Sequence, residues 1–149
     1  MLSGIKNHNV NRFMKIFITG VAGFLGSHLA DLMISQGHTV AGNDNMIGGY
    51  TDNVPQDVEF HQVDCCDLEN LTKAMEGCDI VYHTAATAYE GLSVFSPVLV
   101  TRNIFEASVT TITAAIRNKV KRIVYCSSMA RYGHHDEVPY KETYECRPQ

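Results

Sequence analysis

Residues 19–26 read Thr19-Gly20-Val21-Ala22-Gly23-Phe24-Leu25-Gly26, so that three glycines follow one another at intervals of three residues. An apolar run typical of a strand precedes them at residues 16–19, and a helix-like amphipathic stretch follows at residues 25–36. Between a strand and a helix, such glycines permit a tight turn, let backbone N–H groups approach a pyrophosphate, and allow the helix to pack closely on the strand. The stretch therefore predicts a dinucleotide-binding turn at Gly20, Gly23 and Gly26. The alternative is a glycine-rich turn that binds no ligand.

Short apolar runs alternate with longer amphipathic stretches along the rest of the chain, which is the order of a parallel doubly wound sheet. We expect strands at residues 16–19, 39–42, 58–63, 80–83 and 122–127, and helices at residues 25–36, 68–76 and about 97–118. Gly37 and Gly77 follow two of these helices, where a left-handed residue commonly ends a helix. The predicted fold class is α/β, a Rossmann-like doubly wound parallel sheet that is incomplete at its C-terminus. Residues 1–13 are polar and are expected to form a loose extension before a domain at residues 14–149.

Acidic residues follow the second and third predicted strands. Asp44 lies eighteen residues beyond Gly26, where a carboxylate accepts hydrogen bonds from the adenosine ribose hydroxyls of NAD. No Lys or Arg occurs between Lys15 and Lys73, so no cation nearby in sequence would neutralise the 2′-phosphate of NADP, and NAD is favoured over NADP. The alternative for Asp44 is a solvated loop residue. We assign Asp64 to the adenine amino group and Asp67 to the N-cap of the next helix, although either aspartate could be the cap.

Composition and charge exclude several classes of protein. The net charge is −4 and the twelve Lys and Arg residues are scattered, which argues against a nucleic-acid surface. The five cysteines lack C-x-x-C spacing, and the histidines form no spaced ligand set, so we expect reduced thiols and no metal site. No run approaches the roughly 18 apolar residues of a membrane span. We therefore expect a cytoplasmic protein that binds neither nucleic acid nor membrane.

The chain resembles the extended short-chain dehydrogenase/reductases, in the branch of NAD-dependent nucleotide-sugar epimerases and dehydratases. Its glycine pattern is G-x-x-G-x-x-G, and the match runs from about Met14 to Gln149. Four segments carry the resemblance in the right order: residues 19–29, Asp44-Asn45, His83-Thr84-Ala85-Ala86, and Tyr125-Cys126-Ser127-Ser128-Met129-Ala130-Arg131-Tyr132-Gly133.

The resemblance implies an NAD-binding domain with particular contacts at the pyrophosphate and the ribose. Phe24 and Leu25 would offer backbone amides to the pyrophosphate. Asp44 and Asn45 would hold the adenosine ribose. His83 is a motif position that the resemblance makes a structural support below the cofactor.

Further contacts are implied around the base and along the dinucleotide. Asp64 and Cys65 would border the adenine. Ala85 and Ala86 would let the dinucleotide lie close to the backbone, although ordinary strand-end packing would also explain small residues there. Asn103 corresponds to a family asparagine that approaches the cofactor or the catalytic residues.

Ser128 falls on the catalytic Ser/Thr of the family, whose hydroxyl binds the sugar oxygen that loses its proton. The family base is a tyrosine followed four residues later by a lysine, and none of the seven tyrosines here has that lysine. We therefore expect a piece of a longer enzyme that is inactive alone. The alternative is a truncated dinucleotide-binding module without catalysis.

The residues after Ser128 bear on the type of reaction. In 4,6-dehydratases of the family, acidic residues follow the catalytic Thr at once, whereas Met129 and Ala130 follow here. We therefore predict a 4-epimerase-like activity on a nucleotide sugar, in which a sugar carbon is transiently oxidised by NAD and the hydride then returns. A reductase or decarboxylase is the alternative.

Two expectations concern packing. An apolar stripe on the predicted helix at residues 97–118 comprises Ile104, Val109, Ile112 and Ile116. It serves the core, a homodimer interface as in the resembled family, or both. Cys126 is expected to be an inert thiol in a buried strand.

Overall fold

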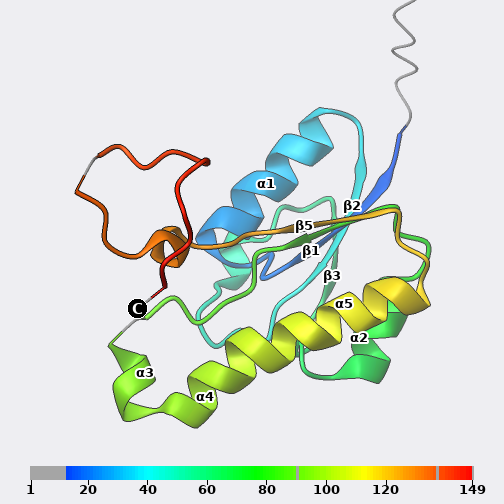
Figure 1. Cartoon of the computed structure of the whole chain (residues 1–149). Helices are drawn as coiled ribbons and strands as arrows, with labels where there is room; N and C mark the ends of the chain where they lie inside the picture. Colours follow the sequence, from blue (N-terminus) through cyan, green and yellow to red (C-terminus); the bar gives the residue numbers. More distant parts are fainter. Residues whose placement is uncertain (1–12, 90, 137, 149) are drawn as a thin grey trace, which may run out of the picture.

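The structure is a computed structural model that describes residues 13–89, 91–136 and 138–148, so almost all of the predicted extension lies outside the described residues. Within them, five parallel strands form one sheet in the order β3-β2-β1-β4-β5 (Figure 1). This arrangement confirms the predicted α/β, Rossmann-like class. The strands are β1 (Lys15–Thr19), β2 (Thr39–Asn43), β3 (Val58–His61), β4 (Ile80–His83) and β5 (Arg122–Tyr125).

Helices cover both faces of the sheet. Helix α1 lies on one face and α2 and α5 lie together on the other (Figure 1). The helices are α1 (Phe24–Ser35), α2 (Leu68–Ala74), α3 (Leu92–Phe95), α4 (Pro97–Thr101) and α5 (Ala107–Arg117). The helix predicted at about 97–118 is present, but a π-helical segment, η2 (Arg102–Glu106), separates α4 from α5. Short 3-10 turns lie at η1 (Thr51–Asn53) and η3 (Met129–Tyr132).

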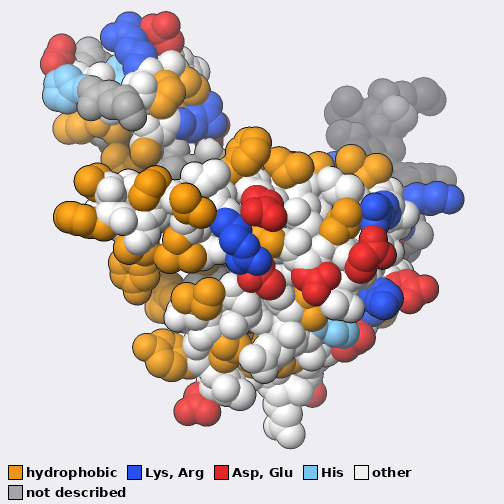
Figure 2. Space-filling model, turned by 90° about the horizontal axis from the view of Figure 1, so that it is seen from below, with side chains coloured by type: hydrophobic (Ala, Val, Ile, Leu, Met, Phe, Trp, Pro, Cys, Tyr) orange, Lys and Arg blue, Asp and Glu red, His pale blue; other side chains and the backbone are white. Residues whose placement is uncertain are grey.

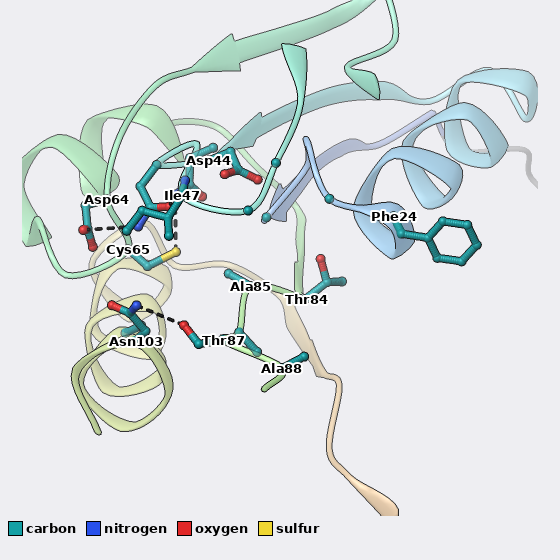
Figure 3. A pocket seen from close by; sticks show the side chains of 18 of the residues that line it. Phe24, Asp44, Ile47, Asp64, Cys65, Thr84, Ala85, Thr87, Ala88 and Asn103 are labelled. Atoms are coloured by element: carbon teal, nitrogen blue, oxygen red, sulfur yellow. Dashed lines mark hydrogen bonds between the residues drawn. The ribbon is translucent and has the colours of Figure 1, made fainter. Parts of the chain in front are cut away.

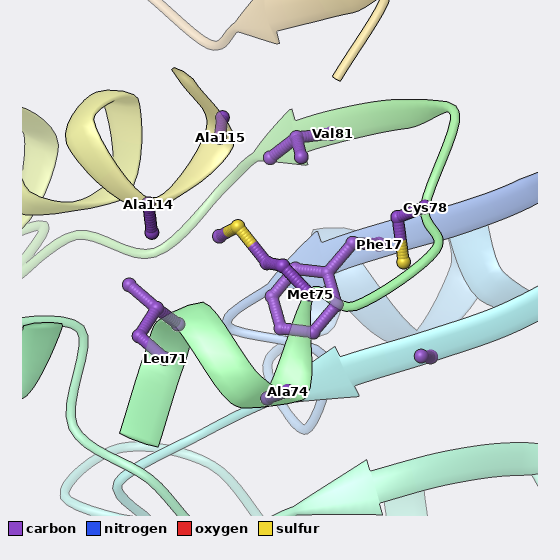
Figure 4. Close-up of a cluster of buried hydrophobic side chains, with 9 residues drawn as sticks. Phe17, Leu71, Ala74, Met75, Cys78, Val81, Ala114 and Ala115 are labelled. Atoms are coloured by element: carbon purple, nitrogen blue, oxygen red, sulfur yellow. The ribbon is translucent and has the colours of Figure 1, made fainter. Parts of the chain in front are cut away.

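The central strand β1 explains why the sheet has a core on each face. Successive side chains of a strand point to opposite faces, so Ile16 and Ile18 pack toward α1, while Phe17 packs toward α2 and α5. Figure 4 shows Phe17 beside Leu71 and Met75 in this second core. The apolar run that predicted β1 is therefore a strand buried on both faces.

The predicted helix-ending and helix-starting signals are present. Gly37 and Gly77 adopt left-handed backbone angles, with φ of +87° and +73°. Asp67 is the N-cap of α2, because its Oδ1 accepts a hydrogen bond of 3.1 Å from the N–H of Asn70. This assigns the cap to Asp67 and leaves the Asp64 carboxylate for other contacts.

The apolar stripe on the long helix is not part of the core. The residues of α5 that face the sheet are small, namely Ala107, Thr111, Ala114 and Ala115. The branched residues of the stripe are exposed instead, at 36% to 70% of their surface. Figure 2 shows hydrophobic side chains gathered on this lower face of the molecule, on the side of α3 and α4. The interpretation of the stripe as core is therefore wrong.

Two further observations concern the cysteines and the helices. All five cysteines are free thiols, and Cys126 lies beyond the end of β5 and is exposed, so its predicted burial is wrong. β5 is shorter than predicted because its pairing with β4 ends at Tyr125. Among the described residues, no helix is both long and apolar enough to cross a membrane.

Candidate functional site

A cavity of about 430 Å³ opens at the carboxyl edge of the sheet, where the glycine turn after β1 meets the loops after β2, β3 and β4. Ligands of doubly wound sheets bind at this edge. Figure 3 shows Asp44, Asp64, Cys65 and Asn103 around this cavity. Ten residues predicted to bind the cofactor line it: Gly20, Gly23, Phe24, Asp44, Asn45, Asp64, Cys65, Ala85, Ala86 and Asn103.

The glycine turn is held against two neighbouring strands. Gly20 has a φ of +71°, and its N–H donates a hydrogen bond of 2.7 Å to the carbonyl of Asn43 at the end of β2. A Cβ on Gly20 would lie 2.9 Å from the Cα of Ala85, and one on Gly26 would lie 2.2 Å from the carbonyl oxygen of Gly20. Gly26 therefore acts through packing of α1 on the turn, and it does not line the cavity.

Helix α1 begins beside the cavity. Gly23 is its N-cap, and the first N–H groups of an α-helix have no acceptor within the helix. The Phe24 side chain is 79% exposed and borders the cavity. Leu25 is half-exposed and is not among the described residues that line the cavity, so only its backbone amide is compatible with the predicted contact.

The Asp44 carboxylate is fixed by two backbone donors. Its Oδ2 accepts a hydrogen bond of 3.1 Å from the N–H of Ala22 in the glycine turn, and its Oδ1 accepts one of 2.8 Å from the N–H of Met46. Gly49 lies so near that a Cβ there would be 3.0 Å from both carboxylate oxygens. Asp44 is only 8% exposed. The glycine turn and the acidic residue predicted to act with it are thus joined directly.

The Asp64 carboxylate pairs with a cation that local sequence reasoning missed. Nη1 of Arg102 lies 2.9 Å from Oδ2 of Asp64, although the two residues are 38 positions apart. Burial raises the pKa of Asp64, but the N–H of Cys66 and the Arg102 guanidinium outweigh this and hold it below its usual value. The absence of cations between Lys15 and Lys73 therefore did not exclude a cation beside the cavity.

The Cys65 thiol is buried next to this pair. Nδ2 of Asn43 lies 3.3 Å from Sγ of Cys65, and burial raises the pKa of the thiol. A thiol held in its protonated form is a poor nucleophile. Cys65 therefore lines the cavity as a buried, protonated thiol.

A buried histidine connects the glycine turn to the loop after β4. The Ser108 hydroxyl donates to the carbonyl of Ile104 at 2.6 Å, so it accepts from Nε2 of His83 at 3.0 Å. Nδ1 of His83 is then the acceptor for the Thr19 hydroxyl at 2.8 Å. The Thr19 oxygen in turn accepts from the N–H of Ala85 at 3.1 Å. His83 is 3% exposed, and burial lowers its pKa, which keeps it neutral in this supporting position.

The remaining predicted residues separate into two groups. Asn103 lines the cavity, and its Nδ2 donates a hydrogen bond of 3.0 Å to Oγ1 of Thr87 (Figure 3). Ser128 is exposed and is not among the described residues that line the cavity. Its Oγ accepts a hydrogen bond of 3.1 Å from the N–H of Ala130 at the start of η3. The catalytic role of Ser128 stays a prediction.

The residues present fit a dinucleotide. The closely packed glycines at the start of α1 leave room for a pyrophosphate, and the buried Asp44 carboxylate is positioned at the end of β2, where the ribose of such a ligand lies. Fold and site together define a dinucleotide-binding domain of the Rossmann type.

Comparison with known proteins identifies the family. The model of the NAD dependent epimerase/dehydratase family matches residues 16–149. The chain belongs to this family, which confirms the resemblance found in its motifs.

Similar proteins include sugar epimerases from distant organisms. The chain is 31% identical over 138 residues to a probable UDP-arabinose 4-epimerase 3 of Arabidopsis thaliana, covering 85% of the chain and 34% of that protein. It is 33% identical over 146 residues to the UDP-glucose 4-epimerase of Caenorhabditis elegans, covering 87% and 42%. The structure of the Thermus thermophilus UDP-glucose 4-epimerase complex with NAD matches with a TM-score of 0.84 and 34% identity, covering 91% and 45%. The chain thus spans less than half the length of these relatives.

Proposed function

We propose that this chain is the NAD-binding portion of a nucleotide-sugar epimerase, most similar in action to a 4-epimerase. The observation that carries the proposal is the hydrogen bond between the Asp44 carboxylate and the N–H of Ala22, which joins the ribose-binding and pyrophosphate-binding elements in one cavity. Membership of the NAD dependent epimerase/dehydratase family supports the choice of cofactor. When bound, NAD supplies a reversible hydride acceptor next to the sugar.

Each element of the cavity has a defined task in this proposal. The turn at Gly20 and Gly23 and the first amides of α1 bind the pyrophosphate. Asp44 accepts from the ribose hydroxyls and repels a 2′-phosphate, so NAD binds more tightly than NADP. Asp64 accepts from the adenine amino group. Calorimetric titration of the chain with both cofactors tests this, and tighter binding of NADP would contradict the ribose assignment.

Ser128 and the residues after it favour one type of reaction. The Ser128 hydroxyl would bind the sugar oxygen that loses its proton, whereas Met129 and Ala130 carry no group that could assist loss of water. The reaction that remains is the reversible oxidation of a sugar carbon, with return of the hydride to the opposite face of that carbon. This reaction is an epimerisation. A protein that contains this chain and is active should interconvert nucleotide hexoses when products are resolved by NMR. Accumulation of a 4-keto-6-deoxy sugar would contradict the assignment.

The chain alone is expected to bind NAD without turnover. No tyrosine of the sequence is followed four residues later by a lysine, and this pair supplies the proton acceptor in the family. The same observation favours the second candidate, a dinucleotide-binding module without catalysis. Conversion of any nucleotide sugar by the purified chain, free of host enzymes, would contradict both the expected lack of turnover and the module without catalysis.

The exposed apolar face of α4 and α5 supports a homodimer as part of this proposal. Val98 is 81% exposed and Ile116 is 70% exposed, and exposed apolar patches of this kind mark interaction sites.

A cytoplasmic location also stays a prediction, and fractionation of cells that express the protein tests it.

A further inference from the structure

The side chain of Arg102 occupies a special position beside the cavity. It opens the π-helical segment η2 and reaches the loop after β3, where Nη1 lies 2.9 Å from Oδ2 of Asp64. Its backbone also contacts this loop, because Sγ of Cys66 donates to the Arg102 carbonyl at 3.4 Å. Arg102 is therefore attached to the Asp64 loop by side chain and backbone together.

This ion pair belongs to a series of contacts around one end of the cavity. Asn45, after β2, places its Nδ2 3.4 Å from Oδ2 of Asp64. Nη1 of Arg102 lies 3.4 Å from Oδ1 of Asn103, and Nδ2 of Asn103 donates to Oγ1 of Thr87 after β4. All of these residues except Arg102 line the cavity, and Figure 3 shows Asp64 and Asn103 on the same side of it. Arg102 joins two groups of cavity residues from outside.

With the hydrogen bonds that it makes to the described residues, the Asp64 carboxylate keeps an acceptor position for a ligand. A carboxylate offers about four such positions. Oδ1 accepts from the N–H of Cys66 at 2.8 Å, and Oδ2 receives both Arg102 and Asn45. The remaining position is on Oδ1. An amino group of a ligand can use it, whereas a carbonyl oxygen would meet a negative charge.

The contribution of the pair to folding stability is small. The Arg102 side chain is 43% exposed and that of Asp64 is 28% exposed, and ion pairs so open to solvent stabilise proteins little. Folding stability therefore does not account for the pair.

We propose that Arg102 is a positioning residue that holds the Asp64 carboxylate in the orientation that selects an adenine amino group over a keto group in the bound dinucleotide. The proposal rests on the proposed function, because it takes the ligand to be NAD. It assigns Arg102 a task in base selectivity.

The test compares NAD with its hypoxanthine analogue, in which a keto oxygen replaces the adenine amino group. The dissociation constants of both are measured by calorimetry for the wild-type chain and for Arg102→Met. Loss of a hydrogen bond to a charged group is worth on the order of tenfold in affinity. We expect the wild type to prefer NAD by about this factor. In Arg102→Met this preference should fall toward one, while binding of nicotinamide mononucleotide, which lacks the base, is unchanged.

A matched control is available on α5. Nη1 of Arg117 lies 2.9 Å from Oε1 of Glu69, so it has the same distance to its carboxylate partner but lies outside the cavity lining. Arg117→Met should leave the preference at its wild-type value. Arg102→Lys keeps the positive charge, so it should keep part of the wild-type preference for NAD. It is the test variant if Arg102→Met does not fold.

The outcomes separate this proposal from the function it rests on. A wild-type chain that does not bind NAD refutes the proposed function and this proposal with it. A wild-type chain that binds NAD and the hypoxanthine analogue equally refutes base selectivity alone. An unchanged preference in a folded Arg102→Met or Arg102→Lys variant refutes the positioning role of Arg102.

Discussion

Replacing Gly26 with alanine tests the packing of α1 on the glycine turn. The new Cβ would lie 2.2 Å from the carbonyl oxygen of Gly20 and 2.9 Å from the Cα of Val21. Ordinary carbon contacts need about 3.5 Å, so helix and turn would have to separate by roughly 1 Å. Overpacking of this kind costs about 1–3 kcal/mol. Because the clash is with backbone atoms, we expect a cost at the upper end of this range; alanine regains up to about 1 kcal/mol of helix propensity, so the net loss should be about 2 kcal/mol.

Urea unfolding followed by circular dichroism measures this loss, and calorimetry measures NAD binding by the same variant. NAD should also bind more weakly, because the displaced turn carries the pyrophosphate site. Gly91→Ala is the matched control, since Gly91 has right-handed backbone angles and no atom within 4 Å of an added Cβ. It should change the free energy of unfolding by less than about 0.5 kcal/mol. A Gly26→Ala variant with wild-type stability and NAD affinity would refute the reasoning.

The cavity and the exposed face of α4 and α5 can each be tested by substitution. Asp44→Ala should weaken NAD binding by about 1–3 kcal/mol in calorimetry, whereas Asp31→Ala, at an exposed position of α1, should not, and equal effects would contradict the ribose assignment. Burial lowers the pKa of His83 below its ordinary 6.5, so as the pH falls from 6.5 toward the folded-state pKa, the unfolded chain binds a proton that the folded chain does not. Stability should therefore drop over this window, and His83→Gln should reduce the drop in urea unfolding at stepped pH; an identical pH profile would refute it. Ile116→Glu should shift the chain toward monomer in analytical ultracentrifugation, and a wild-type chain that is already monomeric would contradict the homodimer.

The elements of the fold were predictable from local signals. The run before Gly20 is apolar because β1 is buried on both faces, and Gly37 and Gly77 end helices because they adopt positive φ. The orientation of α5 was not predictable in this way. Its branched residues are more hydrophobic, but only small side chains such as Ala114 and Ala115 let the helix approach the sheet closely.

The candidate site was predictable where its residues follow one another at strand ends. Asp44 and Asp64 could be placed at the same edge because parallel strands end together there. Arg102 could not be found, because its partner lies 38 residues earlier and the contact depends on the tertiary arrangement of α4 and η2. Thr87 carried no signal beyond its closeness to Ala85. The Asp64–Arg102 pair is a tertiary contact with no local pattern.

The π-helical segment η2 sets the angular phase between α4 and α5. A π turn contains one more residue than the α-helical turn it replaces, and one residue corresponds to about 100° of rotation around the helix axis. If Arg102–Glu106 formed α-helical turns instead, the same residues would rotate all of α4 relative to α5 by roughly this angle. Arg102 would turn away from Asp64 while Ala107 and Thr111 kept their places against the sheet. Because of the extra residue, the small side chains of α5 pack on the sheet while Arg102 still points toward Asp64 beside the cavity.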